Sequence, residues 1–383
     1  MNIGIFTNNY KPRISGLTVS IDTFKETFTE LGHNVFVFCP EYKGYRDSTS
    51  NIIRFRSFPF IKAQGFSLPI PYSFHLFNKT KDLRLDIIHA QHPYLLGKVA
   101  KRWARRLKIP LVFTHHTLYE EYAHYIPFNQ KVIKKLAISS STSFANNCDL
   151  VIVPTPGVKD LIQGYGVKTR IEIVPTGVNL EDFRKDRGRE IRKEYKIPPQ
   201  TKILLYLGRF AKEKNIEFLL HVYKKVQDEY KEVVLFMVGY GPQHREILNL
   251  SKRLDIRNII FTGSREREDI IKFYQAADLF IFSSLTETQG IILIESLAAG
   301  TPVVAVNASG TKDIITHGVT GYLTDLSVPS FVKRVIELLR DDRKREEFSK
   351  NAKVSARMFS SLTTGKRLID LYQELIDGRC AVC

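Results

Sequence analysis

The chain has 383 residues, of which 43% are hydrophobic and 25% charged, and its formal net charge is +17. This length is too great for one typical core and predicts two domains of about 180 residues each. No apolar run approaches the roughly 18 residues of a membrane span, and the first residues lack the charged start and apolar stretch of a signal peptide. We therefore expect a cytoplasmic protein without a transmembrane helix.

The positive charge is concentrated in the first part of the chain. Residues 1–170 contain 23 Lys/Arg and 11 Asp/Glu, whereas residues 171–383 contain 34 and 29. Such a charge attracts polyanions, either nucleic acid or an anionic membrane surface. No RNA-binding, helix-turn-helix or zinc-finger pattern accompanies it, so nucleic acid is not the expected partner.

The first half of the chain alternates predicted strands and helices. A strand at residues 3–7 leads through a loop to a helix that ends at Gly32. Residues 56–77 interrupt the alternation with Pro and Gly among aromatic residues, and they predict an irregular excursion. Further short apolar runs predict strands at residues 35–39, 52–55, 87–90, 111–114 and 150–154.

The second half repeats the alternation after a charged stretch, residues 181–196, which we interpret as the crossing between the domains. Two such α/β halves place a ligand at the carboxyl ends of their strands. Strands are predicted at residues 203–207, 233–239, 259–262, 279–282 and 302–306, and helices at residues 215–230, 244–254 and 362–376.

Residues 279–306 are the most informative stretch. A buried strand, a polar loop, a helix that opens near Gly290 and a second strand predict a βαβ unit of a parallel sheet. The loop carries Glu287, and Glu295 lies two turns into the helix. Free amides at a helix N-terminus suit a phosphate, and ionised carboxylates accept hydrogen bonds from sugar hydroxyls. Together these groups predict a site for a sugar nucleotide.

This pattern resembles a known enzyme family. Two glutamates separated by seven residues, a helix end of small residues and a Pro-Val-Val strand resemble the retaining GT-B glycosyltransferases of the glycogen-synthase-like superfamily, glycosyltransferase family four. The resemblance implies an α/β GT-B fold, with two Rossmann-like domains that face each other across a cleft. We expect an N-terminal domain at residues 1–178, completed by a returning helix at residues 360–378, and a C-terminal domain at residues 179–359.

The resemblance also implies a role for each residue of this stretch. Glu287 is expected to be catalytic and to lie beside the transferred sugar, while Glu295 would hold the ribose hydroxyls of the donor. The start of the helix, at Gly290, Ile291 and Ile292, is expected to contact the donor as well.

Cations are expected near the leaving group, because transfer from a sugar diphosphate expels a dianion. Residues 208–215 follow the first strand of the second half. By resemblance, Arg209 and Lys214 clamp the diphosphate and count as catalytic, and the backbone at Arg265 reads the base. No cofactor is expected to be required, and Mg²⁺ would be non-essential.

The first domain contributes two further candidates. Gly16, at the start of the first helix, would let the backbone approach the donor closely, and Ser15 stands where relatives often have a second glycine. The family places a histidine after a buried strand, facing the donor sugar, and the register assigns His116 as this catalytic residue. The adjacent histidines His115 and His116, together with His89 and His92, raise the possibility of a metal site. Neighbours on a strand point to opposite faces, so the adjacent pair cannot readily share one ion and no metal site is expected.

The acceptor is predicted from two motifs. Residues 114–122 and 286–290 are similar to bacterial glycosyltransferases that glucosylate diacylglycerol. We therefore expect retaining transfer of a hexose, glucose from UDP-glucose, to diacylglycerol, with formation of an α-glycosyl lipid. Since nothing identifies a carboxylate nucleophile, the family's front-face route is adopted, in which the leaving diphosphate assists removal of the acceptor proton. The alternatives are a GT-B enzyme for phosphatidylinositol or a glycan intermediate and, less favoured, a nucleic-acid-binding protein.

A basic helix with one aromatic residue is predicted at residues 98–108. Such a helix lies flat on anionic lipid, which favours a peripheral protein on the inner face of the cell membrane. The alternative is a Rossmann helix with a solvated basic face. The candidate membrane residues are Lys98, Lys101, Arg102, Trp103, Arg105, Arg106 and Lys108. Nearby residues that would extend this surface are Phe58, Phe60, Phe66, Tyr72, Phe74, Phe77, Lys131, Lys134 and Lys135.

The chain ends with Cys380-Ala-Val-Cys383, which fits both a prenylation box and half of a zinc site. No second Cys/His pair at finger spacing accompanies it. We interpret these residues as an accidental tail.

Overall fold

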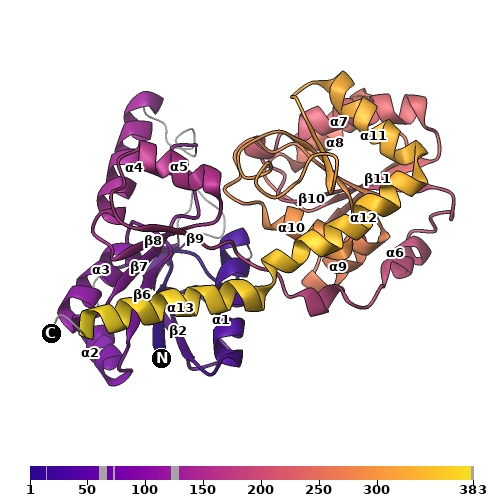
Figure 1. Cartoon of the computed structure of the whole chain (residues 1–383). Helices are drawn as coiled ribbons and strands as arrows, with labels where there is room; N and C mark the ends of the chain where they lie inside the picture. Colours follow the sequence, from indigo (N-terminus) through magenta and orange to yellow (C-terminus); the bar gives the residue numbers. More distant parts are fainter. Residues whose placement is uncertain (14, 60–66, 72–73, 122–128, 381–383) are drawn as a thin grey trace. The chain divides into compact units, whose positions relative to one another are not determined.

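The computed structural model describes residues 1–13, 15–59, 67–71, 74–121 and 129–380 (Figure 1). The chain divides into two compact units. Unit 1 comprises Met1–Gly177 and Ser361–Cys383, and unit 2 comprises Val178–Ser360. The predicted terminal cysteine tail lies outside the described residues, apart from the backbone of Cys380.

Unit 1 contains a seven-stranded sheet in the order β3-β2-β1-β6-β7-β8-β9, and every neighbouring pair is parallel. The inner strands β6, β7 and β8 are short apolar runs buried along their whole length, as a parallel sheet covered by helices requires. The order reverses between β1 and β6, which defines the topological switch point. The strands are β1 (Asn2–Phe6), β2 (Asn34–Pro40), β3 (Ile52–Phe55), β6 (Ile87–Ala90), β7 (Leu111–Thr114), β8 (Leu150–Val153) and β9 (Ile171–Ile173).

The helices of unit 1 include the end of the chain. The last helix, α13 (Ser361–Cys380), packs against α1 (Gly16–Glu30). Its Tyr372 hydroxyl lies 2.5 Å from Nδ1 of His89 on β6, deep in the core. The sequence that closes unit 1 is therefore separated from the rest of that unit by the whole of unit 2. The other helices are α2 (Phe74–Asp82), α3 (Leu96–Leu107), α4 (Gln130–Ala145) and α5 (Pro156–Gly164).

The predicted irregular excursion is more regular than expected. Within it, β4 (Ser57–Pro59) pairs with β5 (Ser67–Pro69) in an antiparallel ladder, and α2 begins before its end. Phe77 is buried in the core and does not extend a surface, whereas Phe58 is 66% exposed. Phe60, Phe66, Tyr72 and the side chain of Phe74 lie outside the described residues.

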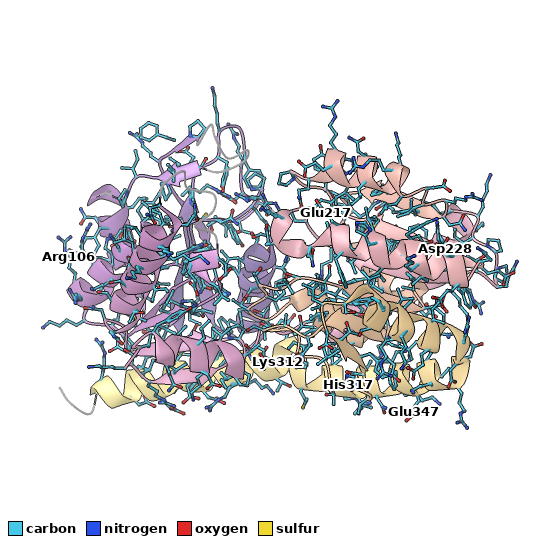
Figure 2. All side chains as sticks on the ribbon, turned by 90° about the horizontal axis from the view of Figure 1, so that it is seen from above. Arg106, Glu217, Asp228, Lys312, His317 and Glu347 are labelled. Carbon is cyan, nitrogen blue, oxygen red and sulfur yellow. The ribbon has the colours of Figure 1, made fainter. Side chains whose placement is uncertain are left out.

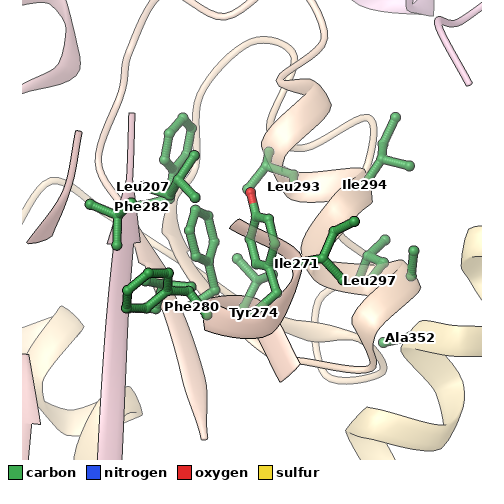
Figure 3. Packing of buried hydrophobic residues seen from close by; sticks show 14 of the residues in the cluster. Leu207, Ile271, Tyr274, Phe280, Phe282, Leu293, Ile294, Leu297 and Ala352 are labelled. Atoms are coloured by element: carbon green, nitrogen blue, oxygen red, sulfur yellow. The ribbon is translucent and has the colours of Figure 1, made fainter. Parts of the chain in front are cut away.

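Unit 2 contains a six-stranded parallel sheet in the order β12-β11-β10-β13-β14-β15, with its switch point between β10 and β13. Figure 3 shows part of its core, where Tyr274 lies beside Phe280 and the apolar side chains of α10. The strands are β10 (Lys202–Leu207), β11 (Val233–Val238), β12 (Ile259–Gly263), β13 (Leu279–Phe282), β14 (Val303–Val306) and β15 (Gly321–Thr324). The helices are α7 (Ile216–Glu229), α8 (His244–Arg253), α9 (Arg267–Ala276), α10 (Ile291–Ala299), α11 (Val328–Arg340) and α12 (Asp342–Ala356).

The charged stretch that we interpreted as the crossing is folded within unit 2. It forms η2 (Leu180–Phe183) and α6 (Gly188–Glu194), and α6 packs on α9. The contact is close, because a Cβ added to Gly188 would lie 2.5 Å from the carbonyl oxygen of Gln275. The chain passes from one unit to the other at Gly177 instead. The interpretation was wrong because charge alone does not distinguish a linker from the solvated face of a helix.

Candidate functional site

The candidate donor site in unit 2 lies at the switch point of its sheet. The strands β10 and β13 are neighbours there, so the loops that follow them emerge side by side at the carboxyl edge. The first loop carries Arg209 and Lys214, and the second carries Glu287. Residues 73 positions apart in the sequence are thereby brought into contact.

Lys214 and Glu287 form an ion pair, in which Nζ of Lys214 donates to Oε1 of Glu287. Burial by itself raises the pKa of Glu287. The positive charge and hydrogen bond of Lys214, helped by a hydrogen bond from Ser284, outweigh it and leave the pKa below its usual value. Glu287 is therefore a carboxylate with a fixed orientation, and acts only as an acceptor.

Two serines that our sequence analysis did not select hold the two loops together. Ser283 Oγ donates to the carbonyl oxygens of Lys214 and Asn215, at 2.9 Å each. Ser284 Oγ donates to the carbonyl oxygen of Glu213 at 3.3 Å. The signal in the sequence is a pair of hydroxyl residues directly after the apolar strand β13, at the edge where parallel strands place their ligands.

The loop after β14 supports Glu287 from a further side. Gly310 has φ +74° and lies so close to Glu287 that an added Cβ would come within 2.4 Å of its carbonyl oxygen. Thr286 and Ser309 form an isolated parallel bridge next to this contact. A side chain at position 310 would displace the loop that carries the carboxylate, so glycine is required here for two reasons.

The helix α10 begins at the same edge, as predicted. Its N-cap residue is Gly290, with φ +75°, and no side chain caps the helix. The first amides, from Ile291 onward, therefore retain the capacity to bind a phosphate. Two turns in, Glu295 is only 4% exposed.

The carboxylate of Glu295 has two partners within unit 2. Arg267 Nη1 donates to Oε1 at 2.5 Å, and the Tyr274 hydroxyl donates to Oε2 at 3.2 Å. Neither partner could be identified from local residue pattern, because both lie on α9, outside the βαβ unit that carries the glutamates. The two contacts fix the orientation of Glu295 at the wall of the site.

The remaining candidates in unit 2 lie at neighbouring strand ends. The side chain of Arg209 is exposed, and it forms no ion pair within the described part of the chain. It follows β10 directly and remains available to an anion. Arg265 follows β12, and its Nη2 donates to the Tyr195 hydroxyl at 2.5 Å. The backbone of Arg265, the predicted base reader, lies two residues beyond the end of β12.

The turn at Gly239 and Gly241 has a packing role. An added Cβ would lie 2.0 Å from the carbonyl oxygen of Gly208 at the first position, and 2.4 Å from that of Phe210 at the second. Both glycines let the loop after β11 lie against the loop that carries Arg209. These close approaches account for both glycines.

In unit 1, the start of α1 lies at the carboxyl end of β1. Ser15 is the N-cap, and its Oγ accepts a hydrogen bond from the amide of Thr18. The serine that replaces a family glycine therefore stabilises the helix start. A Cβ added to Gly16 would meet no atom of the described residues within 4 Å, so packing among those residues does not require glycine at this position.

His116 follows β7, and its Nε2 lies 2.5 Å from Oε1 of Gln91 at the end of β6. An amide oxygen only accepts, so Nε2 carries the proton. Burial, together with the nearby His92, His89 and His115, holds the pKa of His116 well below its usual value. His116 is therefore a neutral imidazole that can accept or donate a hydrogen bond but carries no charge.

The other three histidines of this region are also neutral. Burial lowers the pKa of His89 to about 3, and that of His92 and His115 to about 4. His89 is held by Tyr372 on one side and by Thr114 Oγ1 at 2.6 Å on the other. Within the described residues, no group of three or more His, Cys, Asp or Glu is arranged to hold a metal ion.

The predicted basic helix is α3, and its basic residues lie on the exposed or half-buried side. Trp103, however, is only 3% exposed. Its ring packs edge-on against Phe6 and Phe38, with centroid distances of 5.4 and 5.7 Å. The assignment of Trp103 to a membrane surface was wrong, because the aromatic ring occupies the one stripe of the helix that faces the sheet.

Exposed apolar residues occur on the neighbouring helix instead. On α4, Val132 and Leu136 are 42% and 60% exposed, and they are one turn apart on the same face. Lys131, Lys134 and Lys135 flank them. Of the helices in the described part of the chain, none is long and apolar enough to cross a membrane.

Comparison with known families assigns both halves of the chain. "Glycosyltransferase Family 4" matches residues 14–182, and "Glycosyl transferases group 1" matches residues 188–355. The chain is 33% identical to the alpha-monoglucosyldiacylglycerol synthase of Streptococcus pneumoniae, over 98% of this chain and 86% of that protein. It is 28% identical to the protein of the same name from Acholeplasma laidlawii, over 98% of each.

The fold agrees with this assignment. The structure of sucrose-phosphate synthase from Thermosynechococcus elongatus superimposes with a TM-score of 0.82 at 20% identity, covering 98% of this chain and 99% of that one. The chain belongs to the GT-B glycosyltransferases of family 4, and the predicted fold class is confirmed. It is a nucleotide-sugar-dependent hexosyltransferase.

Proposed function

We propose that this enzyme transfers glucose from UDP-glucose to diacylglycerol at the membrane surface, with retention of configuration. The observation that carries the proposal is the Lys214–Glu287 pair, which lies beside the uncapped N-terminus of α10 at the switch point of unit 2. It combines a cation for a diphosphate, an oriented carboxylate for sugar hydroxyls and helix amides for a phosphate. The names of the Streptococcus and Acholeplasma relatives support diacylglycerol as the acceptor.

Each residue has a task in this reaction. Arg209 and Lys214 neutralise the charge that develops on the departing diphosphate, and Glu287 holds the hydroxyls of the transferred sugar. Glu295 binds the ribose, and the amides at Gly290, Ile291 and Ile292 contact the donor. In unit 1, Gly16 lets the backbone at the start of α1 approach the donor closely, and His116 supplies a neutral hydrogen-bonding group to the sugar. Because Arg209 and Lys214 supply the positive charge that a metal ion would otherwise provide, we propose that no cofactor is required and that Mg²⁺ is non-essential.

The route proposed is departure and attack on the same face of the sugar. A double displacement needs a carboxylate nucleophile close to the anomeric carbon. Glu287 is already held by Lys214 and Ser284, so it serves better as a hydroxyl acceptor than as a nucleophile. The leaving diphosphate, which gains charge as it departs, then assists removal of the acceptor proton.

A lipid acceptor requires contact with a bilayer, and unit 1 supplies a suitable surface. The helices α3 and α4 carry eight Lys or Arg within their bounds and no Asp or Glu. Val132 and Leu136 add exposed apolar side chains on α4. Cations attract the anionic headgroups while these side chains enter the interface. We therefore propose a peripheral enzyme on the inner face of the cell membrane, with no nucleic-acid partner.

The decisive experiment is a transfer assay with the purified enzyme. Radiolabelled UDP-glucose, UDP-galactose and GDP-mannose are each offered with diacylglycerol in vesicles that contain phosphatidylglycerol. The expected product is an α-glucosyl diacylglycerol, formed from UDP-glucose and cleaved by an α-glucosidase. Parallel reactions offer phosphatidylinositol or a glycan primer, and a product in either of these without one from diacylglycerol would overturn the proposed acceptor.

A further inference from the structure

A cavity of about 510 Å³ lies between α3 and α4 in unit 1, and Pro93, in the loop that follows β6, also lines it. Its size falls within the range of roughly 300–1,000 Å³ that small-molecule sites occupy. Five of its lining residues are Lys or Arg and two are Ser, a set that suits an anion. The lining residues that carry this argument are Lys98, Lys101, Arg102, Arg105, Ser140 and Ser143.

Three of the cations that line this cavity form no ion pair among the described residues. Neither helix carries a carboxylate, and no ion pair within the described residues involves Lys98, Lys101 or Arg105. Arg105 Nη2 donates to the neutral amide of Asn147 at 2.9 Å. Burial and the neighbouring charges of Arg105 and Lys98 lower the pKa of Lys101. An anion in the cavity would relieve this repulsion.

The face of α4 that lines the cavity continues into the exposed apolar residues. Val132, Leu136, Ser140 and Ser143 follow one another at spacings of four, four and three, so they lie along one face of the helix. At 1.5 Å per residue, Leu136 lies roughly 10 Å along the axis from Ser143. A ligand that fills this groove has an anionic group at one end and an apolar part at the other. An anionic glycerophospholipid has that form.

We propose that the cavity between α3 and α4 binds the phosphodiester headgroup of one anionic phospholipid, with its acyl chains along Val132 and Leu136. Lys101 and Arg102 face the phosphate, and the hydroxyls of Ser140 and Ser143 donate hydrogen bonds to its oxygens. Arg106, labelled at the outer edge of unit 1 in Figure 2, also lines the cavity, and its guanidinium lies over the ring of Phe77. This site rests on the membrane attachment proposed above. It binds one lipid molecule and is separate from the diacylglycerol acceptor, whereas the attraction between the helix cations and the membrane surface is diffuse.

The test measures binding of soluble lipids by calorimetry, without donor or acceptor. Dihexanoyl phosphatidylglycerol, below its micelle concentration, is compared with dihexanoyl phosphatidylcholine, glycerol 3-phosphate and inorganic phosphate. The double variant Lys101→Ala/Arg102→Ala is expected to weaken phosphatidylglycerol binding roughly twenty-five-fold, at about fivefold for each cation. The matched control is Lys131→Ala/Lys135→Ala, which removes the same charge from α4 outside the cavity and should change the affinity by no more than about twofold at physiological salt.

A second variant tests the shape of the site without changing its charge. Ser143 is exposed at the cavity rim, so Ser143→Phe should fold normally, as thermal unfolding would verify, and should prevent headgroup entry. Equal losses in the two double variants, or full binding by Ser143→Phe, would overturn the proposal. Binding of phosphate, glycerol 3-phosphate or phosphatidylcholine as tight as that of phosphatidylglycerol would overturn the assignment to an anionic lipid. Diacylglycerol takes no part in this binding test. A negative result would therefore leave the proposed transfer reaction intact, and a failed transfer assay would leave the lipid site intact.

Discussion

Lys214 and Glu287, which are 73 residues apart in the sequence, form a partly buried ion pair that joins the loops after two neighbouring strands of unit 2. The pair lies where the order of the sheet reverses, beside the N-terminus of α10. It therefore places a cation, a carboxylate and free helix amides at one strand edge. The acid–base behaviour of this pair gives the first prediction.

Replacing Lys214 with Met should raise the pKa of Glu287, because burial then acts without a neighbouring cation. In the native enzyme the pKa of Glu287 is lowered. Its stabilising contribution is thus present above the unfolded-state pKa and is lost as the pH falls through the folded-state value. In the variant the folded-state pKa of Glu287 lies above the unfolded-state value, so the sign reverses: stability should fall as the pH rises through these values, and turnover should fall about a hundredfold or more. Unfolding free energies measured between pH 4 and 8, together with kcat, provide the check. Lys212→Met, in the same turn but exposed, serves as the control, and an unshifted profile in Lys214→Met would contradict the pairing.

Glu295→Gln should weaken binding of the nucleoside diphosphate more than it affects folding. Loss of a charged hydrogen bond to a buried hydroxyl costs on the order of 1.5–3 kcal/mol, which is roughly ten- to a hundredfold in affinity. Calorimetry with UDP measures this directly. Glu268→Gln removes an exposed carboxylate from the nearby helix α9 and should leave the affinity unchanged. If Glu295→Gln bound UDP as tightly as the native enzyme, the ribose assignment would be incorrect.

Tyr372→Phe should destabilise unit 1 by about 1–3 kcal/mol, because it leaves Nδ1 of His89 buried without its partner. Trp103, the single tryptophan of the chain, lies in the core of unit 1 and reports on its unfolding. A urea titration followed by tryptophan fluorescence therefore measures the effect. Tyr240→Phe, at a position 60% exposed in unit 2, should not shift the curve. If Tyr372→Phe unfolded at the same urea concentration as the native enzyme, the hydrogen bond would not contribute to docking of α13.

Unit 1 should lose stability as the pH falls below about 6.5, the usual histidine pKa. The pKa values of His89, His92, His115 and His116 are all lowered in the folded state. Their contribution is present above the unfolded-state pKa and is lost as the pH falls toward the folded values, at up to about 1.4 kcal/mol per pH unit for each histidine. Fluorescence of Trp103 in urea at pH 7.5, 6.5 and 5.5 gives the slope. His92→Gln should reduce that slope by the amount that corresponds to about one proton. The control His221→Gln, in unit 2, should leave the slope unchanged. A stability of unit 1 that does not depend on pH would contradict the neutral histidine cluster.

Membrane attachment should depend on the cations of α3 and on the apolar face of α4. Reversal of Lys101, Arg102, Arg105 and Arg106 to Glu should release the enzyme from phosphatidylglycerol vesicles, since each cation contributes roughly 1 kcal/mol near such a surface. High salt should have the same effect. Leu136→Ser should weaken the attachment that remains in high salt, whereas Trp103→Phe should not, because that ring lies in the core. Cosedimentation measures each variant, and undiminished binding after charge reversal would leave α3 as a solvated face.

Much of the fold could be predicted from the sequence. Short apolar runs with turn residues between them gave β3, β6, β7 and β13 at their observed bounds, because a strand buried on both faces permits almost no polar residue. The positions of Glu287 and Glu295 around the start of α10 also followed from local pattern, since a βαβ unit fixes where its loop and helix N-terminus lie. The excess of cations on α3 was likewise visible in the residue types alone.

Only the tertiary structure decided which side chains meet. The partners of Glu295, namely Arg267 and Tyr274, lie on a different helix, and the close approach of Gly310 to Glu287 depends on a loop two elements later. The position of Trp103 in the core and the cavity between α3 and α4 depend on how each helix is rotated against the sheet. The pattern of residues predicts secondary structure because strands and helices depend on interactions between residues close in the sequence. The contacts named here arise from packing between segments that lie far apart in the sequence.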